Sequence, residues 1–157
     1  APQLAVDMSL EDYKSNKDPL LDACLNFSDK ETFIDPMVHL RELFMAGKKE
    51  EVETEAKRMS ADPRYRYIDF EDKLNQSGYN LVNAKQMESA IFIFQLNTKL
   101  YPKSANAWDS LGEAFWKTNQ TDKAIECYQK AIDLDPDGET GKNAKAILNQ
   151  IKTGKGN

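Results

Sequence analysis

The chain has 157 residues, enough for one domain with a substantial core, and its 40% hydrophobic and 30% charged residues are typical of a globular protein. Its net charge of −5 argues against a nucleic-acid partner, because phosphate binding needs a basic surface. We also expect no membrane span, since the longest notable apolar run, residues 90–94, is far too short to cross a bilayer.

The first stretch, residues 1–34, predicts an N-terminal arm of short helices or turns. Ser9 with Asp12 three positions later is a capping signal for one short helix. Asp18-Pro19 is typical of a second helix start, because proline is favoured at the first helical position, and residues 28–31 carry a third capping signal. We expect this arm to pack against the hairpin that follows it.

Residues 35–70 predict a degenerate helical hairpin followed by a linker. Asp35-Pro36 begins the first helix, whose apolar stripe ends near Gly47. The second helix has apolar residues at helical spacing over residues 52–59, and Pro63 closes it. The hairpin is therefore of the same kind as the two that come after it, but less regular.

Two clearer helical hairpins follow, at residues 71–104 and 105–138. In the second, Ser104 is suited to cap the first helix, and the next helix begins near Thr121 and stops at Asp135-Pro136. Equivalent residues of the two hairpins differ by 34 in number: Gly78 and Gly112, Ala90 and Ala124, Phe94 and Tyr128, Pro102 and Pro136. These paired positions indicate an internal repeat of two antiparallel helices.

The last stretch, residues 139–152, predicts a terminal helix that is polar except for one stripe. That stripe consists of Ala144, Ile147, Leu148 and Ile151. Because a stack of hairpins exposes the apolar face of its last member, we interpret this segment as a capping helix. Residues 153–157 are predicted to be a disordered tail.

The period of 34 residues resembles that of the tetratricopeptide repeat family. All eight signature positions of that repeat are matched in the second hairpin, by Trp108, Leu111, Gly112, Phe115, Ala124, Tyr128, Ala131 and Pro136. The first hairpin departs from the pattern at four positions, which hold Leu74, Ser77, Leu81 and Asn97. The resemblance covers residues 71–152 and implies an all-α, right-handed superhelix of antiparallel hairpins with a C-terminal capping helix.

The resemblance also implies where a ligand binds. In this family the first helix of each hairpin lines a concave groove, using the face about 100° around from the packing stripe. The residues predicted to line the groove here are Asp72, Asn75, Tyr79, Asn83, Asn106, Asp109, Glu113, Trp116 and Lys117.

The predicted groove favours a particular kind of partner. Some family members grip the terminal carboxylate of a peptide with basic residues and asparagines, whereas the inner helical positions here hold Asp109 and Glu113. On charge grounds we expect a protein or peptide partner with a basic or amide-rich segment. Tyr79 and Trp116 would supply apolar contact. The alternative is that Trp116 packs against the terminal helix and the acids are only solvated.

No pattern in the sequence is typical of a catalytic or metal site. His39 is the one histidine, so a zinc site is not expected. Cys24 and Cys127 are interpreted as half-buried small apolar residues, with one disulfide between them as the alternative in an oxidising compartment. The sequence shows no glycine-rich phosphate loop and no nucleophile elbow. We therefore predict a protein that is not an enzyme and that uses no metal or cofactor.

A second resemblance leaves two other functions open. Residues 78–115 are similar to the C-terminal repeats appended to some secreted or periplasmic bacterial hydrolases, which implies a bacterial and exported setting rather than a cytoplasmic one. The chain would then be an accessory domain of a larger hydrolase, serving stability or substrate positioning. A third function is self-association into a homo-oligomer, because the exposed end of a helical stack can dock on a copy of itself.

Overall fold

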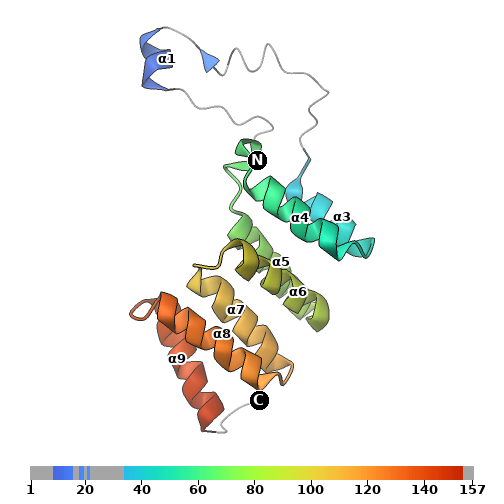
Figure 1. Ribbon diagram of the computed structural model, residues 1–157, viewed down its shortest axis with the longest axis vertical. Coiled ribbons are helices and arrows are strands. Elements are labelled where there is room, and N and C mark those ends of the chain that lie inside the picture. The colour runs from blue at the N-terminus through green and yellow to red at the C-terminus, as the bar shows by residue number, and fades with distance from the viewer. Residues whose placement is uncertain (1–8, 16–17, 20, 22–33, 154–157) are drawn as a thin grey trace. The chain divides into compact units, whose positions relative to one another are not determined.

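The computed structural model describes residues 9–15, 18, 19, 21 and 34–153, and these residues form helices and no strand (Figure 1). The chain divides into two compact units, residues 1–69 and residues 70–157, where its length alone predicted one domain. The all-α fold class is thereby confirmed, with neighbouring helices packed in pairs.

The first unit contains α1 (Leu10–Lys14), α3 (Pro36–Met45), α4 (Lys49–Ser60) and the 3₁₀ helix η1 (Pro63–Tyr65). The predicted capping box at Ser9 is present, because the Ser9 hydroxyl accepts from the Asp12 backbone N–H at 3.0 Å. Asp35 caps α3 in the same way, with Pro36 at the first helical position as expected. Most of the predicted helix after Asp18-Pro19, and the capping signal at residues 28–31, lie outside the described residues.

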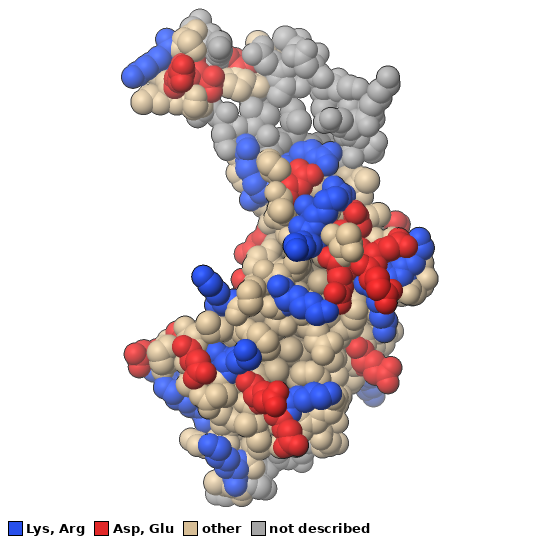
Figure 2. All heavy atoms as spheres, in the orientation of Figure 1, with Lys and Arg blue, Asp and Glu red and all other residues tan. Residues whose placement is uncertain are grey.

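Helices α3 and α4 form the predicted hairpin at residues 35–63. The buried apolar residues of this unit are Leu40, Val52, Ala56, Met59 and Tyr65. A hollow of about 350 Å³ opens beside them, lined by His39, Leu43, Glu50, Glu51, Thr54 and Glu55. Figure 2 shows a group of acidic side chains over this hairpin. Glu55 lies 2.7 Å from Arg58, so part of this acidic charge is neutralised within the unit, and it also lies 3.6 Å from His39.

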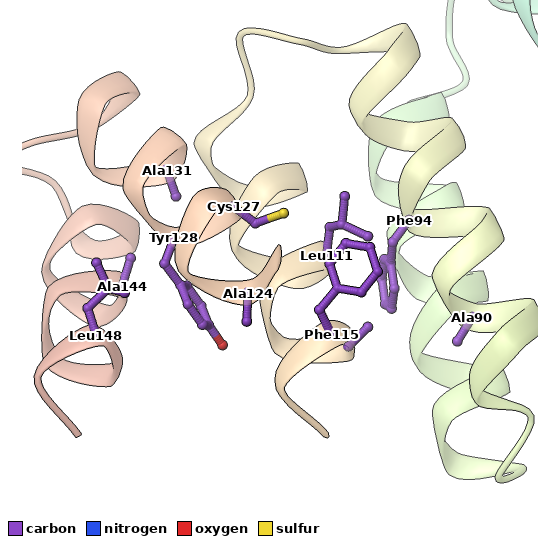
Figure 3. Packing of buried hydrophobic residues seen from close by; sticks show 11 residues of the cluster. Ala90, Phe94, Leu111, Phe115, Ala124, Cys127, Tyr128, Ala131, Ala144 and Leu148 are labelled. Atoms are coloured by element: carbon purple, nitrogen blue, oxygen red, sulfur yellow. The ribbon is translucent and has the colours of Figure 1, made fainter. Parts of the chain in front are cut away.

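The second unit is a run of helices in which each packs against the next (Figure 1). It consists of α5 (Phe70–Asn83), α6 (Met87–Leu100), α7 (Ala105–Lys117), α8 (Thr121–Leu134) and α9 (Glu139–Lys152). Ser104 caps α7 as predicted, since its hydroxyl accepts from the Ala107 N–H at 3.0 Å. The apolar core runs through all of these layers, from Phe94 on α6 through Phe115 and Tyr128 to Leu148 on α9 (Figure 3).

Small residues let the paired helices approach each other. A Cβ atom added at Gly78 would overlap the ring of Phe94, and one added at Gly112 would lie 3.1 Å from the ring of Tyr128. The packing of the α5–α6 hairpin also explains one departure from the repeat pattern. Asn97, which is fully buried, donates from its side chain to the backbone carbonyl of Glu71 at 3.1 Å, so a polar residue there links α6 to α5.

All three hairpins turn in the same way. Between the two helices of each hairpin, one residue adopts a left-handed backbone. Its φ is 77° at Gly47, 60° at Lys85 and 59° at Asn119. In each turn the next N–H, that of residue 48, 86 or 120, donates back to a carbonyl of the preceding helix at 2.9–3.0 Å. The α3–α4 hairpin therefore has the same turn as the two regular hairpins, although its sequence matches them poorly.

Candidate binding face of the second unit

The nine residues predicted to line a groove lie on two neighbouring helices. We call the surface that they form the inner face. Helix α5 carries Asp72, Asn75, Tyr79 and Asn83, and helix α7 carries Asn106, Asp109, Glu113, Trp116 and Lys117. Because α5 and α7 pack against each other, the structure brings several of these side chains together.

Glu113 is the centre of one group of contacts. The Tyr79 hydroxyl donates to its carboxylate at 2.8 Å from α5, and the Lys117 ammonium lies 2.6 Å from it on the same helix. Burial, and then the nearby Glu113 carboxylate, raise the pKa of Tyr79 to about 12, so the hydroxyl remains a donor at neutral pH. Glu113 is thus held in place from both helices while its charge is only partly balanced by an exposed lysine.

Asp109 lies one turn before Glu113 and is bound from another direction. The side-chain amide of Asn143, on α9, donates to its carboxylate at 3.2 Å. Burial raises the pKa of Asp109 to about 6, opposed by the Asn143 hydrogen bond and assisted by the charge of Glu113. At neutral pH the carboxylate is therefore charged in a place where burial disfavours charge.

Two buried side-chain oxygen atoms in this part of the unit, those of Tyr128 and Asn75, have no hydrogen-bond partner among the described residues. The Tyr128 hydroxyl projects from α8 and interacts electrostatically with Asp109 and Glu113, and burial raises its pKa (Figure 3). A buried polar group without a partner is uncommon in native structures, so this part of the inner face has unused hydrogen-bonding capacity.

The other predicted residues are less closely connected to this group. Asp72 is exposed and accepts from Gln76 on its own helix at 2.6 Å, while Asn83 and Asn106 are exposed. Trp116 is partly buried against the core of the unit. The inner face is therefore charged around Asp109 and Glu113, polar toward the start of its helices and apolar toward Trp116.

Sequence reasoning missed three residues that shape this face. They are Ser110, whose hydroxyl lies 3.2 Å from the Tyr79 hydroxyl, Tyr128, and Asn143. Asn143 had a usable signal, because it stands 34 residues after Asp109, as Glu113 stands 34 after Tyr79. The predicted capping role drew attention to the apolar stripe of that helix and away from its polar side.

Other kinds of site find little support in the described part of the chain. No group of three or more potential metal ligands occurs there, and none of its helices is long and apolar enough to cross a membrane. Cys127 is buried, which raises the pKa of its thiol to about 12 and leaves it unreactive. Cys24 lies outside the described residues.

Comparison with known proteins identifies the α7–α8 hairpin as a known repeat. Residues 105–137 match the family model described as tetratricopeptide repeat. Superkiller protein 3 of Schizosaccharomyces pombe is 39% identical over 56 residues, which are 36% of this chain and 4% of the relative. The mitochondrial import receptor subunit TOM70 of Rattus norvegicus is 32% identical over 75 residues, 48% of this chain and 12% of the relative.

A third relative carries the repeat in its name. The small glutamine-rich tetratricopeptide repeat-containing protein 2 of Mycosarcoma maydis is 34% identical over 61 residues, 39% of this chain and 17% of the relative. The chain thus spans less than a fifth of each of these three relatives. They come from two fungi and a rat and none has a hydrolase name, so the bacterial setting and the accessory-domain alternative stay predictions.

The structure is that of a helical-repeat protein. Its helices are paired, its hairpins share one kind of turn, and residues 105–137 match a repeat of this class. Residues 105–137 form a tetratricopeptide repeat, and two relatives named for that repeat match 39% and 56% of the chain. This repeat is a protein-interaction fold and not a catalytic one, so the repeat-containing part of the chain forms a protein–protein interaction module.

Proposed function

We propose that the inner face binds a basic segment of a partner protein. The observation that carries this proposal is the charged Asp109 carboxylate, which the protein retains in a partly buried position despite the effect of burial on its pKa. Glu113 stands one turn away and adds a second negative charge to the same side of α7. A lysine or arginine side chain placed between them would be attracted by both carboxylates.

The donors that already contact these acids indicate how a partner would be held. Lys117 lies 2.6 Å from Glu113, which shows that the carboxylate accommodates an ammonium group. Asn143 supplies Asp109 with a neutral donor only, so the charge of Asp109 remains available to a cation.

The relatives are consistent with recognition of other proteins. One of them is by name an import receptor subunit of mitochondria. This chain spans only 12% of that receptor subunit, so the likeness does not extend to the activity of the whole receptor subunit. What supports the proposal is the chemistry of the inner face.

The test is a selection of random twelve-residue peptides displayed on phage, using the 157-residue chain as bait. A parallel selection uses the chain with Asp109→Asn and Glu113→Gln, which removes both charges but keeps the side-chain shapes. A control bait carries Glu126→Gln and Asp133→Asn, two exposed acids of α8. We expect peptides enriched in lysine and arginine from the wild-type and control baits, and no such enrichment from the inner-face variant. Equal recovery from all three baits would exclude the proposal.

A further inference from the structure

Helix α9 continues the row of helices that forms the inner face. Two hydrogen bonds connect residues exactly one repeat apart: Tyr79 of α5 with Glu113 of α7, and Asn143 of α9 with Asp109 of α7. Helices α7 and α9 also pack directly against each other. Helix α9 therefore stands to α7 in the same register as α7 stands to α5.

This register determines which residues of α9 extend the inner face. The positions one repeat after Glu113 and Lys117 are Ile147 and Ile151. Both isoleucines are partly buried and pack against the core of the unit, as Trp116 does. The side that carries acids on α7 thus carries branched apolar residues on α9, and these residues keep part of their surface exposed.

The opposite side of α9 has a different character. The residues one repeat after the packing stripe Trp108, Leu111 and Phe115 are Lys142, Lys145 and Asn149, and all three are exposed. Helix α9 therefore lacks the apolar stripe that pairs α7 with α8. Of its partly exposed apolar residues, Ile147 stands in register with Glu113 and Ile151 with Lys117.

We propose that α9 is part of the binding face and that the partner segment is amphipathic. A lysine or arginine of the partner lies against Asp109 and Glu113, and an apolar side chain beside it packs on Ile147 and Ile151. This inference rests on the proposed function and adds the apolar half of the ligand. The occupant follows from charge complementarity to the acids combined with the adjacent isoleucines, because a purely basic peptide would leave that apolar surface in water.

The displayed peptides test this first. We expect the basic peptides selected on the wild-type chain to carry a leucine, isoleucine, valine or phenylalanine at a fixed spacing from the lysine or arginine. Peptides that are basic without any apolar preference would overturn the amphipathic ligand while leaving the proposed function intact. Absence of basic enrichment relative to the inner-face variant would overturn both.

Variants of α9 test the named residues. The affinity of one selected peptide is measured by calorimetry for Ile147→Ala, for Ile151→Ala and for the matched control Ile132→Ala. Ile132 lies on α8 and is also partly buried against the core, so its variant loses the same atoms at a comparable site. We expect about a tenfold loss of affinity for each α9 variant and no loss for the control, with folding verified by circular dichroism.

Two results would contradict the role of α9. Equal affinities for all three isoleucine variants would remove Ile147 and Ile151 from the binding face. A dimer in light scattering that Ile147→Ala or Ile151→Ala disperses would assign the apolar surface to a second copy of the chain rather than to a peptide.

Discussion

At the scale of single residues, the hairpin turns show how one backbone position tolerates different side chains. Gly47, Lys85 and Asn119 all adopt a left-handed backbone. Glycine has no side-chain penalty there, and asparagine visits this region more readily than most residues. Lysine has neither advantage, so Lys85 is the strained member of the three.

We predict that Lys85→Gly stabilises the second unit by about 0.5–1 kcal/mol, because relief of the left-handed strain exceeds the added entropy of the unfolded chain. The free energy of unfolding would be measured by urea denaturation. The matched control is Lys73→Gly, at an exposed position inside α5, which should lower the free energy of unfolding by about 1 kcal/mol. Destabilisation by both substitutions would show that the turn carries no strain.

A second residue-scale prediction concerns the stability cost of Asp109. Its native pKa is about 6, above the value of about 3.9 expected in the unfolded chain, so the native state takes up a proton first as the pH falls. Protonation of this group therefore raises the free energy of unfolding as the pH falls from about 7 to 4. The contribution is lost as the pH rises through the native pKa. Asp109→Asn should raise the free energy of unfolding at pH 7 by about 1 kcal/mol, after allowance for its partial exposure.

The gain from Asp109→Asn should vanish near pH 4, where the native wild-type carboxyl is protonated. Urea denaturation at pH 7, 6, 5 and 4 measures it. The same variant should weaken basic peptides at pH 7, so one substitution would improve stability and impair binding. A gain that is independent of pH would contradict the titration argument, and unchanged binding would contradict the proposed function.

The sequence predicted this residue but not its surroundings. Asp109 and Glu113 followed from the family resemblance and helical periodicity, and Tyr79 and Glu113 do meet across the two helices. The contact with Asn143 depends on how α9 packs against α7, and a periodic pattern within one helix carries no information about that. The burial of the Asn75 side-chain carbonyl and the Tyr128 hydroxyl without a hydrogen-bond partner among the described residues likewise depends on tertiary packing.

At the scale of helices, the repeat pattern predicted packing well wherever its signature positions were occupied. Gly112 and Tyr128 meet as the regular hairpin requires, and Gly78 meets Phe94 in the same manner. Asn97 replaces an alanine at the packed surface, and its side-chain amide donates a buried hydrogen bond to α5, whereas its side-chain carbonyl has no partner among the described residues. The hydrogen bond involves a backbone carbonyl 26 residues away and cannot be read from the sequence alone.

We predict different effects for the same substitution in the two hairpins. Gly78→Ala forces the fully buried Phe94 ring to move and should destabilise the unit by about 1–2 kcal/mol, after the helix-propensity gain of alanine is included. Gly112→Ala leaves the new methyl group 3.1 Å from the Tyr128 ring, which a small shift can relieve. Its effect should be close to zero, because strain and propensity offset each other.

Urea denaturation followed by tryptophan fluorescence measures both glycine variants, since Trp108 and Trp116 lie in the second unit. Each variant serves as the control for the other. Equal losses in the free energy of unfolding would mean that the Phe94 ring can shift as easily as the Tyr128 ring. That result would contradict the packing argument for the α5–α6 hairpin.

At the scale of the whole molecule, the two compact units were not foreseen. Length and composition fit one domain, and the first hairpin was interpreted as the start of one continuous stack. Whether successive hairpins form one compact unit or two depends on how extensively they pack against each other. The periodicity inside each hairpin does not determine that packing. Only the linker predicted at the end of residues 35–70 hinted at an irregularity in the repeat.

We predict that the two units unfold in separate steps. The first unit has a small described core of Leu40, Val52, Ala56, Met59 and Tyr65, whereas the core of the second extends through five helices. In urea, the far-ultraviolet circular dichroism should therefore begin to fall before the fluorescence of the two tryptophans changes. Met59→Ala, which removes a fully buried side chain from the first unit, should move the early step to lower urea and leave the fluorescence midpoint unchanged. Gly78→Ala should do the reverse. Superimposable curves from the two probes, shifted together by Met59→Ala, would show that the units unfold as one.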